Sequence, residues 1–285
     1  DKYMQLIRFG EAGKEKPGLL MNGKRKDLSS KFRDWDRDFF QDNGLNRIME
    51  ILKDPIDFPD VPDNLRWASC VARPGKVICI GLNYTDHANE SGMPIPEEPI
   101  VFLKGTNTVV GPYDNVLIPR NSKKTDWEVE LGIVIGKNAR YLKKTEEVKD
   151  YIAGYCISHD VSEREFQLDK GGQWTKGKSC DNFNPIGPFM ATSDELSDIN
   201  NLSMELLVNG KQMQKGNTKY MIFDCEYIVH YLSQFMTLEA GDIISTGTPP
   251  GVGLGMFPAQ YLKEGDVVEV KIEGLGVQKQ TCVNS

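Results

Sequence analysis

Short apolar runs, each ended by glycine, proline or an asparagine–glycine pair, dominate this sequence and limit what it can fold into. Runs of roughly four to eight residues between turn signals are typical of β-strands, whereas a helix usually needs ten or more. The 27 glycines and 15 prolines interrupt the chain too often for long helices over most of its length. We therefore expect an α+β fold that is rich in strands.

The pattern places these elements along the chain. The predicted strands cover residues 4–9, 18–21, 76–81, 100–104, 127–135, 204–208, 242–246 and 267–272. The predicted helices cover residues 46–53, 162–169 and 224–236. Asn22-Gly23 and Asn209-Gly210 predict tight hairpin turns, because both central residues of such a turn need positive φ angles.

A proline-rich segment at residues 55–63 cannot continue a helix and is typical of a linker. It predicts two domains, a small N-terminal α+β domain at 1–66 and a larger catalytic domain at 67–285. The length of 285 residues is sufficient for both.

Charge and cysteine content exclude several classes of protein. The net charge of −7 comes from mixed acidic and basic residues, so we expect no nucleic-acid partner. No apolar run approaches the roughly 20 residues that cross a bilayer, and the start of the chain lacks the apolar core of a signal peptide. Six cysteines without a C-x-x-C pair favour a reducing, cytoplasmic setting, and three histidines without ligand spacing disfavour zinc.

Three acidic residues are candidates for a metal site. Glu128 and Glu130 are two positions apart in a predicted strand, so both side chains point to the same face. Asp126 would join them if the strand starts early. Asp160 ends the apolar segment 152–160, where an acidic residue is unusual unless it binds a partner or a metal.

Simpler interpretations of these acids stay open at this stage. The pair Glu128 and Glu130 could line a solvent-facing strand edge, and Asp160 or Ser162 could cap the helix that follows. If the three carboxylates converge, however, they raise one another's pKa unless a cation is present. An all-oxygen site selects Mg²⁺, with Mn²⁺ as a substitute.

His87 and Glu90 lie three residues apart in a segment that we expect to form a short helix or a loop. A carboxylate beside an imidazole forms a general base that can activate water. The segment is bounded by glycine and proline residues, which suggests a mobile lid. An exposed helix pair without a role is the competing interpretation.

Two lysines and a glycine-rich loop are further candidates. Lys178 follows a glycine-rich stretch and could stabilise an enolate oxygen, or it could be a solvated loop charge. Lys104 ends a strand and either reaches the surface or enters a site. In the loop 245–255, backbone N–H groups and Thr248 could hold a carboxylate. Its two prolines and the lack of a following helix argue against a dinucleotide site.

Together these segments resemble the fumarylacetoacetate hydrolase superfamily over about residues 70–280. The motifs that carry the resemblance, in family order, are G-L-N-Y-x-x-H-x-x-E (81–90), P-x-x-F-x-K (99–104), D-W-E-x-E-L (126–131), D-x-x-x-R-x-x-Q (160–167), K-S (178–179) and T-G-T-P-x-G-V-G (246–253). The chain looks closest to bacterial hydrolases of 2,4-diketo-3-deoxy sugar acids and to relatives labelled ureidoglycolate lyase. Ile80 stands where animal members carry a further aspartate ligand, so the resemblance is to the shorter bacterial type.

The resemblance implies a fold, a site and an assembly. The fold is the mixed β-roll of this superfamily, and the protein is a homodimer. Mg²⁺ binds to Glu128, Glu130 and Asp160. The catalytic residues are His87, Glu90 and Lys178, and the substrate contacts are Tyr84, Lys104, Arg164, Gln167 and Thr248.

The expected reaction is metal-dependent hydrolysis of a C–C bond in a small 2,4-dioxo acid, either an acylpyruvate or a diketo-deoxy sugar acid, with release of pyruvate. The same metal site would also serve a ureidoglycolate lyase, a 2-hydroxymuconate-type isomerase or an oxaloacetate decarboxylase. A non-catalytic metabolite-binding protein is the alternative from another class.

Overall fold

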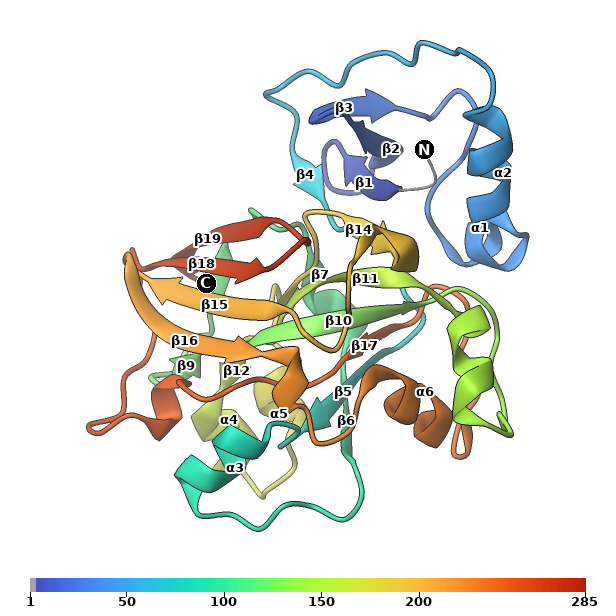
Figure 1. Cartoon of the computed structure of the whole chain (residues 1–285). Coiled ribbons are helices and arrows are strands. Elements are labelled where there is room, and N and C mark those ends of the chain that lie inside the picture. The colour runs from blue at the N-terminus through green and yellow to red at the C-terminus, as the bar shows by residue number, and fades with distance from the viewer. Residues whose placement is uncertain (1–3) are drawn as a thin grey trace.

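A ten-stranded mixed sheet runs through the molecule (Figure 1). The structure, a computed structural model, describes residues 4–285, with side chains for all of them except Glu90 and Ser91. The order of the sheet is β3-β2-β1-β14-β11-β10-β17-β5-β6, and β4 pairs with β1. Its strands are β1 (Gln5–Phe9), β2 (Lys16–Met21), β3 (Lys24–Asp27), β4 (Trp67–Ala68), β5 (Val77–Gly81), β6 (Ile100–Lys104), β10 (Val129–Ile135), β11 (Ile152–His159), β14 (Met190–Thr192) and β17 (Ile243–Ser245).

A second sheet of five strands lies beside β10 and β11, in the order β16-β15-β18-β19-β8 (Figure 1). Its strands are β8 (Val116–Ile118), β15 (Ser203–Val208), β16 (Lys211–Asn217), β18 (Val267–Ile272) and β19 (Val277–Asn284). Two short pairs complete the strands: β7 (Val109–Val110) with β13 (Asn184–Pro185), and β9 (Thr125–Asp126) with β12 (Ser162–Glu163). The fold is therefore strand-rich and mixed, as the sequence predicts.

The helices are short and lie around the sheets. They are α1 (Arg37–Gln41), α2 (Gly44–Ile51), α3 (Thr85–Ser91), α4 (Arg164–Leu168), α5 (Thr175–Lys178) and α6 (Cys225–Ser233), with 3₁₀ turns at Thr106–Thr108, Thr145–Tyr151, Ser193–Glu195, Thr218–Tyr220 and Gly253–Gly255. Figure 1 shows α3, α4 and α5 gathered at one end of the molecule. No helix among the described residues has the length and apolarity to span a membrane.

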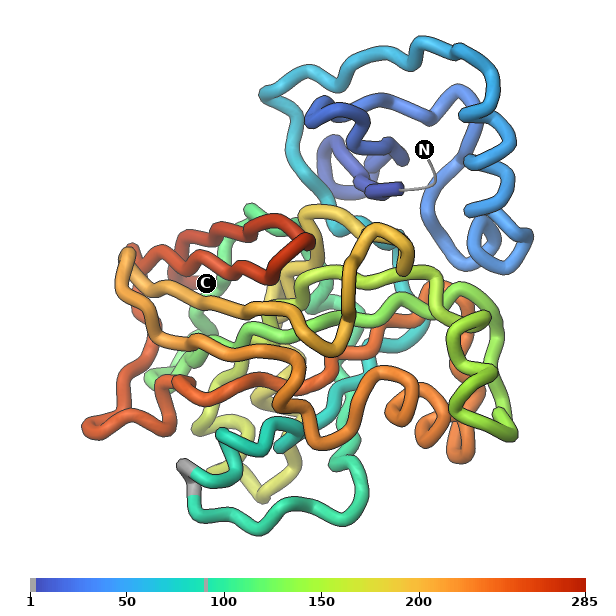
Figure 2. Tube along the Cα trace, in the orientation of Figure 1, coloured from blue at the N-terminus to red at the C-terminus, as the bar shows by residue number. Residues whose placement is uncertain are grey.

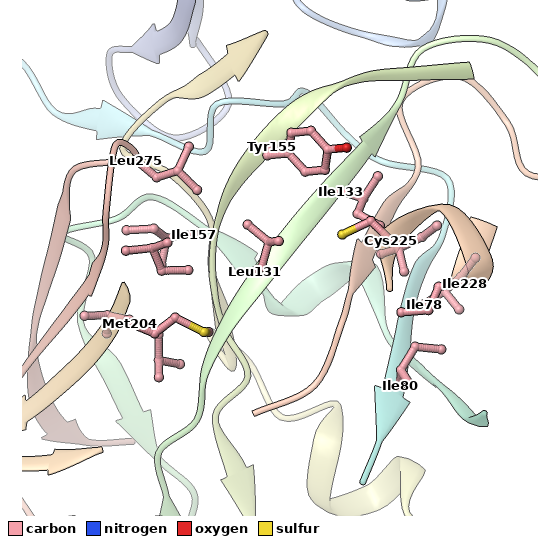
Figure 3. Packing of buried hydrophobic residues seen from close by; sticks show 14 of the residues in the cluster. Ile78, Ile80, Leu131, Ile133, Tyr155, Ile157, Met204, Cys225, Ile228 and Leu275 are labelled. Carbon is pink, nitrogen blue, oxygen red and sulfur yellow. The ribbon is translucent and has the colours of Figure 1, made fainter. Parts of the chain in front are cut away.

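The main hydrophobic core lies between the two sheets and α6 (Figure 3). Leu131 of β10 and Ile157 of β11 pack in this core, where Met204 comes from the second sheet and Ile228 from α6. Every residue of β10 is buried, on both faces of the strand. The interpretation of the acid-bearing face as a solvent-facing edge is therefore wrong.

Residues 4 to about 65 form a small unit that is set apart in the view yet joined to the main sheet (Figure 2). In the backbone pairing, β1 is hydrogen-bonded to β14, with Leu6 opposite Met190. The expected boundary at residue 66 falls just before β4, which pairs with β1. A second hydrophobic cluster joins Leu6 and Trp35 of this unit to Val134 of β10.

Both predicted hairpin turns occur with the expected backbone. Asn22 and Asn209 have positive φ angles of 53° and 51°, and Gly23 and Gly210 follow with 76° and 78°. The turns join β2 to β3 and β15 to β16. The chain reverses tightly at these positions because asparagine and glycine tolerate left-handed backbone.

Several predicted boundaries differ from the structure by one to three residues, and two of them lie next to the candidate site. The strand expected at 127–135 begins at Val129, and the helix expected at 162–169 begins at Arg164. The carboxylate of Glu163 accepts hydrogen bonds from the first turn of α4. The interpretation that Asp160 or Ser162 caps this helix is therefore wrong, because Ser162 and Glu163 first pair with β9.

Candidate active site

Three carboxylates converge where β10 begins and its neighbour β11 ends. Glu128 comes just before β10, Glu130 lies within it, and Asp160 comes just after β11. The two strands pair antiparallel, and the backbone N–H of Asp160 donates to the carbonyl of Glu128 at 3.0 Å. One oxygen from each carboxylate lies within 4.8 Å of the other two, and all three side chains are buried.

Two buried lysines contact this group of acids. Lys104 Nζ lies 2.6 Å from Asp160 Oδ1. Lys178 Nζ lies 3.1 Å from Asp160 Oδ2 and 3.4 Å from Glu128 Oε2, and it donates to Ser162 Oγ at 2.7 Å. The ammonium of Lys104 therefore does not reach the surface but is buried against Asp160.

The neighbouring charges separate the pKa values of two of the acids. Burial raises the pKa of Glu130 well above its ordinary value, and Asp160 and Glu128 raise it further. Burial also raises the pKa of Asp160, but Lys104 and Lys178 outweigh that effect and hold it well below its ordinary value. Burial lowers the pKa of Lys178, yet Asp160 and Glu128 reverse the direction, so the ammonium stays charged.

Arg164, on the first turn of α4, links a fourth acid to the site. Its Nη2 donates to Glu128 at 2.8 Å, its Nη1 to Gln167 at 3.1 Å, and its Nε to Asp126 at 2.9 Å. Asp126 also accepts backbone hydrogen bonds from Gly253 and Leu254. Asp126 therefore holds Arg164 and a loop rather than joining the three converging carboxylates.

The glycine-rich loop at 245–255 binds carboxylates, but they are the protein's own. The backbone N–H of Gly247 donates to Glu130 Oε1 at 2.7 Å. Gly247 has a φ angle of 105°, and an added Cβ would approach Asn83 closely, so only glycine fits here. Thr248 Oγ1 donates to the carbonyl of Val129 and accepts from Gln214 Nε2.

A cavity of about 440 Å³ lies beside Glu128 and Lys178. Its polar lining comprises His87, Glu128, Arg164, Gln167, Lys178 and Thr248. His87 comes from α3, which faces α4 and α5 in Figure 1. The cavity thus brings together polar residues that are up to 161 positions apart in the sequence, from His87 to Thr248.

Three predicted site residues lie elsewhere or cannot be placed. Tyr84 is fully buried and its hydroxyl donates to Met204 Sδ at 3.0 Å, away from the lining residues. Lys104 lies behind Asp160 and does not line the cavity. The side chain of Glu90 lies outside the described part of the structure, although its backbone is in α3.

Sequence reasoning missed the apolar lining and one hydroxyl. Phe102 and Trp174 line the cavity, and Ser162 accepts from Lys178. Apolar residues give no chemical signal of a site, because the same residue types fill every core. The serine could be suspected only from its place two residues after Asp160.

The three carboxylates fit a hard divalent cation. They offer oxygen atoms alone, within a spacing that one ion can bridge. Burial first, and then repulsion from Asp160 and Glu128, raise the pKa of Glu130, and a cation would offset both effects. Glu128, Glu130 and Asp160 would hold such an ion.

Comparison with known proteins identifies a family and relatives that this chain resembles. Residues 76–283 match the family described as fumarylacetoacetate hydrolase, C-terminal. A protein of Burkholderia ambifaria named "Putative hydrolase" is 50% identical over 99% of this chain and 100% of its own length.

Solved structures resemble the whole chain. A fumarylacetoacetate hydrolase of Exiguobacterium antarcticum is 34% identical, with a TM-score of 0.83 over 99% of this chain and 100% of its own. A maleylpyruvate hydrolase of Sphingobium, solved with manganese(II) and pyruvate, is 28% identical, with a TM-score of 0.82 over 99% and 100% of the two chains. A 2-hydroxyhepta-2,4-diene-1,7-dioate isomerase of Mycobacterium marinum is 29% identical, with a TM-score of 0.78 over 99% of each.

Proposed function

The chain belongs to the fumarylacetoacetate hydrolase family, and from this premise we propose that it hydrolyses the C3–C4 bond of a small 2,4-dioxo acid. The products would be pyruvate and a carboxylic acid. Members of the family are metal-dependent hydrolases and isomerases, so the chain is an enzyme rather than a metabolite-binding module.

One observation carries the proposal. Three oxygen ligands lie together, and one of them, Glu128, lines a cavity with a charged lysine and with a histidine from a separate helix. A bound Mg²⁺ or Mn²⁺ would act there as a Lewis acid and offset negative charge that develops on the substrate. The maleylpyruvate hydrolase that resembles this chain was solved with manganese(II) and pyruvate, which supports a divalent metal and a 2-oxo acid as the ligands proposed here.

Each residue of the site has a separate role in the proposed reaction. His87, with Glu90 three positions later, takes a proton from a water that attacks the C4 carbonyl. As the C3–C4 bond breaks, its electron pair moves to the oxygen on C2, and the ammonium of Lys178 donates a hydrogen bond to that oxygen. C3 then takes up a proton and pyruvate is complete. Arg164 and Gln167 orient the substrate from α4.

Pyruvate release from 2,4-dioxo acids tests the proposal. We expect release with Mg²⁺ or Mn²⁺, its loss with excess EDTA, and a loss of at least about 100-fold in Glu128→Gln. Glu146→Gln is the matched control, because Glu146 is an exposed acid outside the cavity. Absence of pyruvate from every dioxo acid, with metal bound, would contradict C–C hydrolysis.

Isomerisation is the second candidate, because the dienedioate isomerase resembles this chain over its whole length. An isomerase moves a proton within the substrate and adds no water. Reaction in H₂¹⁸O distinguishes the two functions, since hydrolysis places one ¹⁸O in the carboxylic acid product. An isomerase would instead change the ultraviolet spectrum of a dienol without releasing pyruvate.

The assembly and compartment inferred from the sequence stay predictions. We propose that the protein is a homodimer. We also propose a reducing, cytoplasmic setting, and the six free cysteines support that setting. Light scattering on the purified protein would give the oligomeric state.

A further inference from the structure

The two cationic residues that line the cavity both lie beside Glu128, and most of its other described lining is apolar. Lys178 and Arg164 contact Glu128 at 3.4 Å and 2.8 Å, so the cationic groups lie at the metal end. The apolar lining includes Ile80, Phe102, Leu168, Trp174, Val252 and Leu254. Apart from Arg164 and Lys178, no lysine or arginine is among the described residues that line the cavity.

Trp174 and Phe102 form an apolar corner next to the reacting groups. Their rings meet edge to face, with centroids 5.1 Å apart. The Lys178 ammonium lies 4.8 Å from the centre of the Phe102 ring. Trp174 and Lys178 are four residues apart, about one helical turn, and the N–H of Lys178 donates to the carbonyl of Trp174. The apolar corner therefore begins within one turn of the residue that contacts the leaving pyruvate.

The mouth of the cavity is also apolar. Met93, Leu168 and Leu254 line it with 47%, 43% and 41% of their surfaces exposed. Three large apolar side chains exposed around one opening are typical of a site for an apolar ligand.

The apolar lining should favour some substrate groups over others beyond the carbonyl that water attacks. A carboxylate there would lose its hydration without a cationic partner, and a hydroxylated chain would lose hydrogen bonds to water. A hydrocarbon group loses nothing comparable and gains from leaving water.

We propose that the substrate carries an uncharged, apolar acyl group, alkyl or aryl, beyond the carbonyl that water attacks. The inference rests on the proposed function and narrows its substrate class to acylpyruvates. Hydroxylated sugar acids and dicarboxylates are then poor substrates. Trp174 is the main determinant of this specificity.

A matched pair of substrates tests the proposal. 2,4-Dioxoheptanoate and 2,4-dioxoheptanedioate share a carbon chain and differ in a terminal methyl against a carboxylate. We expect kcat/KM for the dicarboxylate to be at least about 100-fold lower. From acetylpyruvate to longer acylpyruvates, kcat/KM should rise about fourfold per methylene. Faster turnover of the dicarboxylate, or of 7-hydroxy-2,4-dioxoheptanoate, would overturn the proposal.

Two variants locate the effect. Trp174→Ala should lower kcat/KM for benzoylpyruvate at least about tenfold and that for acetylpyruvate less than about threefold, because the small acyl group does not reach the ring. Phe235→Ala, an exposed aromatic residue outside the cavity, is the control. Leu168→Arg, at the exposed rim, should raise relative turnover of the dicarboxylate about tenfold. An unchanged ratio in both variants would contradict the assignment of the wall.

Binding separates this inference from the reaction itself. 2-Oxoheptanoate and 2-oxoheptanedioate lack the carbonyl at C4 and cannot be cleaved. In calorimetry with Mg²⁺, the monoacid should bind at least about tenfold more tightly than the diacid. If the monoacid binds more tightly but no dioxo acid releases pyruvate, the proposed hydrolysis is wrong and the apolar subsite is still supported. If the diacid binds as tightly as the monoacid, or more tightly, the proposed apolar subsite is contradicted.

Discussion

At the residue scale, the site depends on how buried charges are matched. Asp160 contacts two ammonium groups, at 2.6 Å and 3.1 Å, whereas Glu130 accepts a hydrogen bond from one backbone N–H. Both carboxylates are fully buried, so their neighbours decide the direction of each pKa. The pKa of Asp160 is therefore lowered and that of Glu130 raised, and a bound cation would favour the ionised form of both.

Replacement of Lys178 tests its role on the leaving group. Lys178→Met should lower pyruvate release by about 10²–10³-fold, as removal of a preorganised donor does in other enzymes. Mg²⁺ should bind at least as tightly as before, because a positive charge 3.1 Å from Asp160 is lost. Steady-state kinetics and metal titration measure the two effects. Lys176→Met is the control on the same helix, since Lys176 is exposed and donates to the carbonyl of Lys170. Equal losses in both variants would contradict the assignment.

The pKa of Glu130 predicts a dependence of metal binding on pH. The ordinary value is 4.5, and burial raises it in the metal-free protein. Between 4.5 and the raised value, the folded state holds a proton that the unfolded state has lost, so metal-free stability falls as pH rises. A bound Mg²⁺ would displace that proton, and its stabilising effect should therefore increase as pH rises from 4.5 towards the raised pKa of Glu130.

Thermal unfolding with Mg²⁺ and with EDTA at several pH values measures this effect. Glu130→Gln, which carries no titrating group at this position, should show a shift that depends less on pH. A shift that is constant with pH in the unmodified protein would contradict a protonated Glu130.

At the element scale, two short helices position the reacting groups by packing on each other. Gly177 of α5 lies directly against the backbone of α4, where an added Cβ would overlap the nitrogen of Gln167 and the carbonyl oxygen of Glu163. This close approach brings Lys178 of α5 and Arg164 of α4 to the same carboxylate, Glu128. Helices of four and five residues have little stability of their own, so their positions depend on this contact.

A methyl group at Gly177 should therefore separate the two helices. We expect Gly177→Ala to lower kcat/KM at least about tenfold, because displacements near 1 Å at reacting groups cost that much or more. Thermal unfolding would show reduced stability as well. Thr175→Ala adds the same residue at an exposed position of α5 and should retain activity. Full activity in Gly177→Ala would show that α5 can shift without moving Lys178.

At the scale of the whole molecule, the N-terminal unit and the catalytic part share one sheet. β1 pairs with β14, which pairs with β11, the strand that leads to Asp160. Trp35 is fully buried in the cluster that includes residues of β10, and its indole N–H donates to the carbonyls of Ile7 and Gly18. We propose that the two parts unfold as one cooperative unit, although the linker at residues 55–63 separates them in sequence.

Removal of the Trp35 side chain tests this coupling. Trp35→Ala should lower the free energy of unfolding by about 3–5 kcal/mol, the usual cost of removing a buried aromatic side chain. Activity and circular dichroism should be lost at the same, lower urea concentration. Phe257→Ala, at a fully exposed position, should change stability by less than about 0.5 kcal/mol. Activity that survives a first unfolding step would show that the N-terminal unit unfolds independently.

Much of the strand pattern and part of the site could be predicted from local spacing. The hairpins at Asn22 and Asn209 were predictable because only a few residue types tolerate their backbone angles. Glu128 and Glu130 share a face because side chains alternate along an extended chain. Strand β19 was missed, since Gln278 and Gln280 are fully buried there and break the apolar pattern.

Local spacing was sufficient to predict which residue types carry the chemistry and which short segments form strands and turns, because backbone geometry acts over a few residues. The packing of distant segments, by contrast, establishes that Asp126 binds Arg164 while Asp160 joins the glutamates, and that Lys104 is buried against Asp160. It also decided that Phe102 and Trp174 form a wall. These contacts join residues 30 to 72 positions apart, as from Glu130 to Asp160 and from Phe102 to Trp174. Their formation depends on how strands and helices pack, which local spacing does not specify.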